Sequence, residues 1–531
     1  MIRLKENYLE WALKHLQKYS HSDFYPKIFE FQAISHNWEE VKRYLLSLDL
    51  EEYEAKSPMI CLAPKPNGNY RVAHQLEPCD SLIYTSLIRE VCEIIERYRI
   101  PESQNIVCSY RIKPDKEGSF FSADKGWDIF ISRTEELANE FKRGWVVVAD
   151  VTDFYNQIYT HRINNLIEEA GGRKYSGQAK IIENFLLSLN KKTSRGIPVG
   201  PAPSIILAEL IMGSIDKKIL EYTNKFVRYV DDIRMFFNNA EDAIHALHDL
   251  TFFLYSSHRL VFSGEKTETI PVKVFLEKYM KDERKIEKTT LMSKAEELAA
   301  EKMYELVENL PEYSDDFNYD EEYEKTLVKI LSQEQLKLLS STYYELFKKA
   351  LAAPIDYGLL RHVLRQSAKY RIRNIVPLLL EHFYKIRPVI RESVIYLNAV
   401  VNDKTVSKYK TEFESLYSHF LMNQPFINIW LSHLLQNDSF NRIGLPANYD
   451  NISSIRGQAL ISLRRKDTTW VRSFRDKIDG LGPWDKRAVL YSSSILPLDE
   501  MQPLVKTVAS GGDIIEKSIA SFILSKKKSK Q

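Results

Sequence analysis

Two short apolar runs that each end in aspartates place the strongest limit on how this chain can fold. The first run is Trp145–Ala149 (WVVVA), and Asp150 follows it. The second is Phe226–Val230 (FVRYV), and Asp231 and Asp232 follow it. Continuous apolar runs rich in β-branched residues are typical of strands that are buried on both faces. The sequence therefore predicts a mixed α/β core with carboxylates at its strand ends.

The positions of these carboxylates indicate a metal site. If the two strands are neighbours in one sheet, Asp150 and Asp231 converge, and their mutual repulsion calls for cations between them. Two divalent ions about 3.5–4 Å apart can clamp the attacking and leaving oxygens of a phosphoryl displacement. The alternative is that they are ordinary turn aspartates, because a Tyr-x-Asp-Asp string by itself is a weak signal.

Composition narrows the class of protein. A chain of 531 residues with 27% charged and 44% apolar residues is expected to form several packed domains. Its net charge of +2 excludes a uniformly basic nucleic-acid coat, so a polyanion would have to bind in a local groove. The longest apolar stretch, Ser204–Ile215, is interrupted by Glu209, and no signal peptide is evident. We therefore expect a cytoplasmic protein without membrane contact.

Three regions are expected along the chain. Residues 1–57 form a helical extension, with helices predicted at Leu4–Tyr19 and Glu39–Leu48. Residues 58–290 hold the α/β core, and residues 291–531 show one helical apolar period after another, as in an all-α, HEAT-like solenoid. The acidic segment Ser314–Glu324 is expected to be a solvated loop near the start of that region.

Further motifs surround the aspartates in a fixed order. They are a hairpin over Met59–Ala73 with Lys65 and Arg71, a DxxxFY string from Asp150 to Tyr155, a GxPxG string at Gly196–Gly200, the YVDD string, and Gly264–Thr267 (GEKT). This order resembles the motif series of reverse transcriptases over residues 58 to about 285. The resemblance implies an α+β fingers-palm fold and a nucleotidyltransferase that makes DNA from dNTPs.

The resemblance also implies roles for the acidic residues. Asp150 and Asp231 would bind two Mg²⁺ ions, or Mn²⁺ in their place, with the Val151 carbonyl as a further ligand and Asp232 beside them. Lys266 would protonate or steady the departing pyrophosphate. Asp153 lies at a variable position of the family and is expected to be solvated or to cap a helix.

The nucleotide would be held by residues from three motifs. The Tyr155 ring would lie under the incoming sugar and exclude a 2′-hydroxyl, the alternative being a core tyrosine. Lys65 and Arg71 would grip the triphosphate. A three-residue loop, Asn67–Asn69, would place both cations on one face of the hairpin, and a two-residue loop would place them on opposite faces. Binding of the triphosphate requires both cations on one face of the hairpin.

The GxPxG segment departs from the family pattern. Val199 and Gly200 would lie beside the nascent base pair, and Ser204 is expected to cap the helix that follows. Most templated members have glutamine at the position of Val199, and valine cannot form hydrogen bonds with a template. Phe275 and Leu276 resemble the primer-grip hairpin, with plain core packing as the alternative.

The Val199-Gly200-Pro201 variant, the YVDD string and the helical C-terminal half resemble the bacterial abortive-infection (Abi) reverse transcriptases of the AbiK-like, prophage-encoded type. This resemblance implies template-independent DNA synthesis primed on a protein hydroxyl, with the single-stranded product covalently attached. It further implies a homo-oligomer that defends bacteria against phage in response to a phage component. Tyr8 and Tyr44 are primer candidates in the N-terminal extension, with packing or surface roles as the alternative.

Two other functions remain open. A conventional reverse transcriptase that copies an RNA, as retrons do, would need the same aspartates and Mg²⁺. An inactive polymerase fold could instead serve as an interaction scaffold through its helical region. The presence of every acidic position argues against the scaffold.

Overall fold

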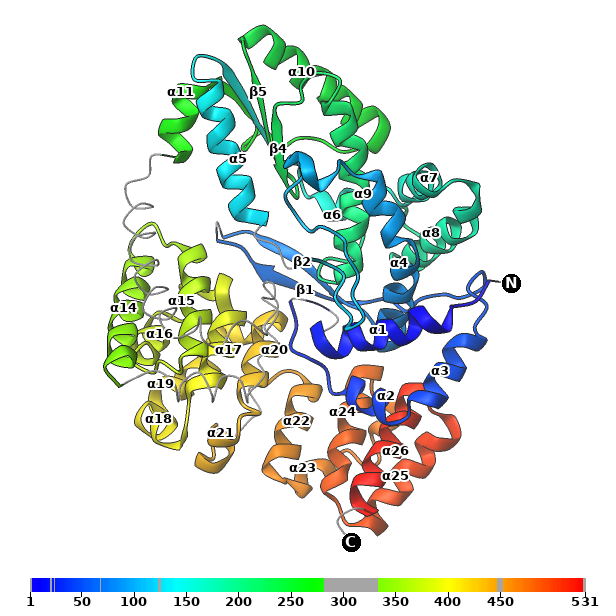
Figure 1. The fold of residues 1–531 in the computed structure, drawn as a ribbon. Helices are drawn as coiled ribbons and strands as arrows, with labels where there is room; N and C mark the ends of the chain where they lie inside the picture. Colours follow the sequence, from blue (N-terminus) through cyan, green and yellow to red (C-terminus); the bar gives the residue numbers. More distant parts are fainter. Residues whose placement is uncertain are drawn as a thin grey trace.

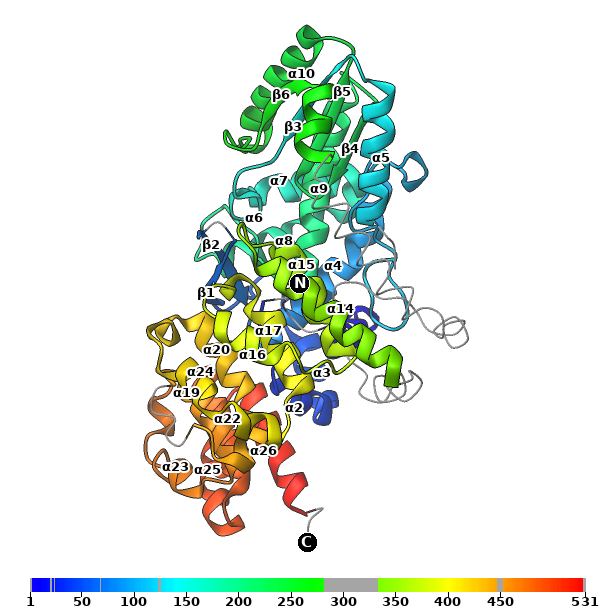
Figure 2. The same ribbon diagram turned by 90° about the vertical axis from the view of Figure 1, so that its left-hand side faces the viewer.

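The computed structural model describes residues 2–19, 22, 24–66, 68–122, 126–280, 333–446 and 452–528. A four-stranded sheet with its helices lies at one end, a two-stranded hairpin lies near the middle, and the C-terminal helices form the other end (Figures 1 and 2). The predicted boundary at residue 290 and the acidic segment Ser314–Glu324 fall outside the described residues. No helix in these ranges is long and apolar enough to cross a membrane.

Three helices precede the hairpin, namely α1 (Glu6–Tyr19), α2 (Glu30–His36) and α3 (Trp38–Ser47). The helix α1 packs against α4 (Pro78–Tyr98). Its predicted apolar face is buried, including Leu9, Leu13 and Leu16. The N-terminal helices therefore join the core of the α/β region.

The sheet contains β3 (Trp145–Ala149), β4 (Phe226–Tyr229), β5 (Asp232–Phe237) and β6 (Glu268–Pro271). Its order is β4-β5-β3-β6, and every pair is antiparallel. The strands before Asp150 and Asp231, β3 and β4, therefore belong to one sheet but are not direct neighbours in it. The strands β4 and β5 form a tight hairpin, so β5 lies between β4 and β3.

Both faces of β3 are buried, as its composition predicts. Val146 and Val148 belong to a cluster with Phe130 of α5 (Gly126–Glu140) and Phe275 of α11 (Val272–Phe275). Val147 and Ala149 point the other way, into the main core with α9 (Ala202–Ile219) and α10 (Ala240–Phe253). The alternation holds the strand in one register, because a one-residue slip would exchange the two faces.

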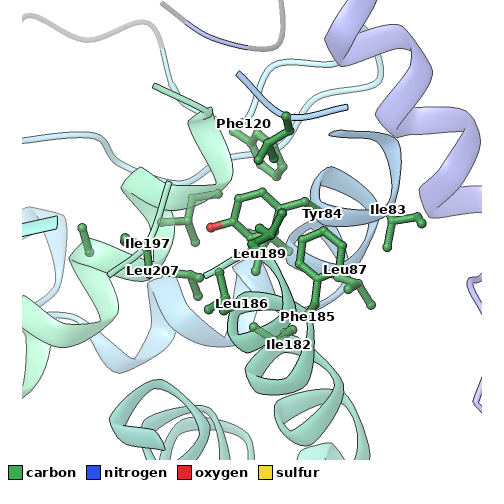
Figure 3. Close-up of a cluster of buried hydrophobic side chains, with 14 of the residues drawn as sticks. Ile83, Tyr84, Leu87, Phe120, Ile182, Phe185, Leu186, Leu189, Ile197 and Leu207 are labelled. Carbon is green, nitrogen blue, oxygen red and sulfur yellow. The ribbon is translucent and has the colours of Figure 1, made fainter. Parts of the chain in front are cut away.

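The core beside the sheet is formed by α4, α9, α7 (Thr160–Gly171) and α8 (Ser176–Leu189). Figure 3 shows Tyr84 of α4 among Phe185, Leu189 and Leu207. The Tyr84 hydroxyl lies 2.9 Å from Ser204 Oγ. The prediction that Ser204 caps α9 is wrong, because Pro201 occupies the N-cap and Ser204 lies in the first turn.

Every secondary-structure element described beyond residue 332 is helical. The α-helices are α14 (Gln333–Leu351), α15 (Tyr357–Lys369), α16 (Val376–His382), α17 (Ile390–Val400), α18 (Asp403–Lys408), α19 (Lys410–Ser418), α20 (Pro425–Leu434), α21 (Asp438–Ile443), α22 (Ile455–Arg465), α23 (Thr468–Arg472), α24 (Pro483–Ser492), α25 (Leu498–Gly511) and α26 (Ile514–Lys528). This confirms a helical C-terminal region. A HEAT-like solenoid remains a prediction.

The C-terminal helices contact the rest of the chain in two places. The helices α14 to α20 share a core with one face of the hairpin β1 (Met59–Pro64) and β2 (Tyr70–Gln75), through Cys61, Ala63 and Ala73. The helices α22 to α26 share the main core with the N-terminal helices. There the fully buried Arg487 donates two hydrogen bonds, of 2.7 and 2.9 Å, to Glu77 before α4.

Candidate active site

The sheet brings the predicted acidic residues together. The register pairs Ala149 of β3 with Ile233 of β5, so it continues to Asp150 opposite Asp232. Asp231 lies in the turn between β4 and β5. Lys266 approaches from the loop before β6, with its Nζ 2.8 Å from Asp150 Oδ2. Four groups from three separate motifs therefore meet at one end of the sheet.

Electrostatic effects show how close these groups lie. Burial, followed by the negative charge of Asp150, raises the pKa of Asp231 to about 6. Burial also raises the pKa of Asp232, and Arg234, 3.6 Å away, opposes this effect. The hydrogen bond that Lys266 donates to Asp150 raises the pKa of Lys266. The carboxylates therefore repel one another in spite of the lysine, and added positive charge would stabilise them.

The turn that carries Asp231 is held in an unusual conformation. Val230 has a φ of 54°, which a β-branched residue rarely adopts. Its carbonyl accepts a 2.7 Å hydrogen bond from Arg228 Nη1, and its N–H donates a 2.9 Å hydrogen bond to Ser109 Oγ. The Ser109 hydroxyl in turn donates to Glu209 Oε1 at 2.8 Å. Both polar groups of the strained residue are therefore tied to the core.

A buried charge network lies beneath this turn. Arg228 donates two 2.8 Å hydrogen bonds to Asp216 and two, of 2.9 and 3.3 Å, to Glu209. Arg99 donates to the same Glu209 at 2.7 Å. Two guanidinium groups thus balance two carboxylates, which makes their burial tolerable. Sequence reasoning missed this network, although two signals were present, namely Arg228 within an apolar strand and Glu209 within an apolar helix.

The hairpin presents its two predicted cations on one face. Lys65 N donates to Asn69 O at 2.7 Å, and Arg71 pairs with Ala63. Arg71 is therefore paired with Ala63 and not, as a 67–69 loop would require, with Lys65. Lys65 and Arg71 are diagonal neighbours on the same face and not a directly opposed pair. The one-face condition of the sequence analysis is met.

Tyr155 lies half-buried on α6 (Phe154–Gln157), close to the acidic cluster. Burial raises the pKa of Tyr155 well above its usual value. Among smaller effects, the negative charge of Asp231 raises this pKa and the positive charge of Arg71 lowers it. Tyr155 therefore lies within electrostatic range of both the turn that carries Asp231 and the hairpin.

The GxPxG segment is bound to the hairpin through its backbone. Val199 N donates to His74 Nδ1 at 3.0 Å, and His74 N donates to Val199 O at 3.0 Å. The Val199 side chain is only 8% exposed. Gly200 has a φ of 124°, and a Cβ there would clash with Ser22 Oγ. Position 200 thus requires glycine, and the N–H and carbonyl of Val199 both form hydrogen bonds within the protein.

The other predicted site residues lie elsewhere. Tyr8 contacts Arg89, and Tyr44 on α3 is 43% exposed with Asp80 and Asp513 nearby. No contact described in the structure joins either tyrosine to the acidic cluster. Phe275 is fully buried in a short helix, so the expected primer-grip hairpin is wrong and the core alternative holds.

The acidic cluster offers ligands for a divalent metal, though not a complete set. Asp150 and Asp231 supply oxygen ligands, and the adjacent Val151 carbonyl is a third group of the kind that Mg²⁺ accepts. Among the described residues, no three acidic, histidine or cysteine side chains are grouped as a finished metal site. The raised pKa of Asp231 nevertheless fits a cluster that a cation would stabilise.

Comparison with known proteins finds one family model that matches part of the chain. Residues 63–297 match the family model described as reverse transcriptase (RNA-dependent DNA polymerase). No curated protein matches the chain. Similar solved structures include a telomerase from Candida albicans in complex with a TWJ fragment of telomeric RNA (11% identity, 79% of this chain and 69% of that chain covered, TM-score 0.30). Another is the apo telomerase from Candida tropicalis (11% identity, 75% and 73% covered, TM-score 0.32).

Proposed function

We propose that this chain makes DNA without a template and primes the DNA on one of its own hydroxyl groups. It carries a reverse transcriptase domain over residues 63–297 and is thereby a nucleotidyltransferase of the RNA-directed DNA polymerase family. Its biological role would be phage defence by abortive infection. The proposal includes a cytoplasmic homo-oligomer that assembles through residues 291–531 and responds to a phage component.

The observation that carries the polymerase chemistry is the contact between Lys266 and Asp150 beside Asp231. Asp150 and Asp231, with the Val151 carbonyl, would hold two Mg²⁺ ions, or Mn²⁺. When bound, such ions stabilise the charge that develops during an in-line phosphoryl transfer. Lys266 Nζ, 2.8 Å from Asp150 Oδ2, carries the proton that the departing pyrophosphate needs. Asp232, beside Asp150 and tied to Arg234, adds to the negative field of the site.

Nucleotide binding would use the hairpin and α6. Lys65 and Arg71, on one face of the hairpin, suit a triphosphate because lysine offers a point charge and arginine a bidentate fork. Tyr155 lies near both Arg71 and Asp231, which suits a ring placed under the sugar. Its bulk would exclude a 2′-hydroxyl and so select dNTPs.

The surroundings of Val199 support synthesis without a template. Its side chain is buried and has no hydrogen-bonding group, and its N–H and carbonyl are both bonded to His74. Position 199 therefore offers no polar group to a template base. Gly200 keeps the backbone close to the protein at this point.

The decisive experiment measures the intact mass of the purified protein after incubation with dNTPs and Mg²⁺ in the absence of added nucleic acid. The proposal expects mass increments of whole nucleotides, and digestion would then show whether Tyr8, Tyr44 or another residue carries the strand. Asp231→Asn should abolish the increments. The matched control is Asp153→Asn, because Asp153 is exposed and bonds only local side chains among its described contacts.

Other outcomes identify the alternatives. Synthesis that begins only when an RNA template is supplied would favour the retron-like enzyme and contradict untemplated activity. Phage defence that survives Asp231→Asn would instead favour the inactive scaffold. Light scattering of the purified chain tests the homo-oligomer independently.

A further inference from the structure

A large groove lies between the hairpin, the N-terminal segment and the C-terminal helices, away from the acidic cluster. Its volume is about 1300 Å³. Met59–Cys61 of β1 line one part, and residues along α20, α22 and α24 line another. Figure 2 shows β1 and these three helices on the same side of the molecule. The groove therefore joins the polymerase-like region to the helical region.

The residues that line this groove carry more positive than negative charge. Its anionic lining residues are Asp438 and Asp485. Its cationic lining residues are Lys27, Arg456, Arg464, Lys466, Lys526 and Lys527. His433 also lines it, and burial lowers the pKa of this imidazole to about 4, so it is neutral at pH 7. A chain whose total charge is only +2 thus gathers a clear positive excess in one groove.

Several of these cations are available to a ligand. Arg464 and Lys466 are exposed, Lys527 is half-buried, and none of the three forms an ion pair with a described residue. Arg456 differs, because it donates two hydrogen bonds to the buried Glu30. Asp485 is occupied as well, since it accepts a 3.0 Å hydrogen bond from the Arg456 backbone. The local imbalance is therefore carried mainly by the three cations without ion pairs.

The wall of the groove also contains aromatic rings, which pack against one another and against arginine side chains. The Arg456 guanidinium lies 4.8 Å from the centre of the Phe29 ring and 5.0 Å from that of Trp484. Tyr491 stacks on Phe29, with ring centres 4.3 Å apart. These rings are half-buried and line the groove. Unpaired bases stack on aromatic rings and on arginine planes, whereas the bases of a duplex are already stacked.

We infer that this groove binds single-stranded nucleic acid, through phosphate contacts from Arg464, Lys466 and Lys527 and base contacts from its aromatic wall. Such binding combines a positively charged groove with stacking surfaces and depends strongly on salt. The ligand is either a DNA strand or an RNA strand, which share this chemistry. The inference does not depend on catalysis, because it concerns a site separate from the aspartates.

The test measures fluorescence anisotropy of a labelled oligodeoxythymidylate with the full chain, over a series of salt concentrations. The Asp231→Asn background is used without dNTPs, so that no strand made by the protein fills the groove. The triple variant R464E/K466E/K527E should bind at least tenfold more weakly. The slope of log affinity against log salt should fall in magnitude by about 2, because each lost phosphate contact removes about 0.7.

The matched control reverses three exposed lysines outside the groove, in K385E/K404E/K408E, and thus makes the same change in net charge. It should retain nearly all of the affinity. Equal binding by both triple variants, or equal loss in both, would overturn the inference. Circular dichroism and thermal melting verify that each variant is folded.

Further arms of the experiment define the ligand. Oligouridylate of the same length distinguishes an RNA strand from a DNA strand, and a duplex of the same length tests the role of unpaired bases. Equal affinity for the duplex and for heparin would reduce the groove to a general polyanion surface and contradict the inference. Because no synthesis occurs in this assay, a negative result leaves the proposed polymerase activity intact, and a failed polymerase assay leaves the groove intact.

Discussion

Lys266 Nζ lies 2.8 Å from Asp150 Oδ2, although 116 positions separate the two residues in the chain. The contact joins the end of β3 to the loop before β6 and places the lysine's proton beside the acidic cluster. In this arrangement the lysine both offsets negative charge and carries a transferable proton, and the two roles can be separated by substitution.

We expect Lys266→Ala to lower kcat at least about 100-fold and to change KM for dNTP much less, because a positioned general acid contributes about 10²- to 10⁴-fold. Lys266→Arg keeps the charge but does not release a proton near neutral pH. Steady-state kinetics should therefore find Lys266→Arg nearly as impaired as Lys266→Ala. Wild-type kcat in Lys266→Arg would contradict the acid role, and the exposed Lys273→Ala serves as the control.

The Val230 turn gives a second prediction. Ser109→Ala removes the acceptor of the Val230 N–H and the donor to Glu209. We expect the free energy of unfolding to fall by about 1–3 kcal/mol, since buried polar groups lose their hydrogen-bond partners. We also expect kcat to fall about tenfold or more, because small displacements of reacting groups are costly. Ser119→Ala is the matched control, because that buried hydroxyl bonds Phe121 O and not the turn. Equal kcat in the two variants would contradict a positioning role.

Tyr155 is expected to select the sugar. Tyr155→Ala should raise incorporation of rNTPs relative to dNTPs, because the ring near Asp231 and Arg71 would no longer fill the space beside the sugar. Competition between the two nucleotide types in one reaction measures this ratio. The nearby Tyr159→Ala should leave it unchanged. An unaltered ratio in Tyr155→Ala would make Tyr155 a core residue, the alternative from the sequence.

His74 predicts how stability depends on pH. Burial lowers the pKa of His74 to about 4 from an ordinary 6.5, and its Nδ1 must be unprotonated to accept from Val199 N. As the pH falls, His74 therefore takes up a proton in the unfolded chain at a higher pH than in the folded chain. The stability that His74 contributes is complete above about pH 6.5 and is lost toward pH 4, by about 3 kcal/mol at most.

Thermal melting of wild type and His74→Gln between pH 7 and pH 4.5 tests this expectation. Glutamine can accept the same hydrogen bond but does not titrate. On acidification, the melting temperature of the variant should fall by less than that of the wild type. Identical losses would show that His74 does not contribute to the acid sensitivity.

Arg487 predicts how firmly the C-terminal helices bind the rest of the chain. Arg487→Met should destabilise the protein by about 3–5 kcal/mol, because Glu77 and Glu30 would be left buried beside a neutral side chain. Chemical denaturation measures the loss. The control is Arg472→Met, whose two hydrogen bonds with Glu500 lie at the surface and contribute little. Equal stability of the two variants would contradict a structural role for the buried cluster.

The sequence predicted the features that depend on neighbouring residues. The apolar run at Trp145–Ala149 is the strand β3 at the predicted bounds, and the hairpin begins at Met59 as expected. The identity of the acidic cluster also followed from the sequence, because strand ends and turn strings are local patterns. Local periodicity and turn chemistry determine such elements before any tertiary contact forms.

Features that depend on distant segments were missed or mistaken. Ser204 has the chemistry of a cap, but the packing of α9 against Tyr84 gives its hydroxyl another partner. Arg71 pairs with Ala63 instead of with Lys65, and only this observed pairing shows that both cations still share a face. Side-chain direction in a strand depends on register, and register is a property of the pair.

The residues themselves determined that two β-prone runs end in aspartates, and that a lysine and a tyrosine accompany them in a fixed order along the chain. Tertiary structure alone decided that β5 separates β3 from β4, and that Arg228, Glu209 and Ser109 hold the Val230 turn from beneath. The physical reason is that a charge can be buried only where its counter-charge arrives, and Arg99 and Glu209 are 110 positions apart. No local pattern contains that information.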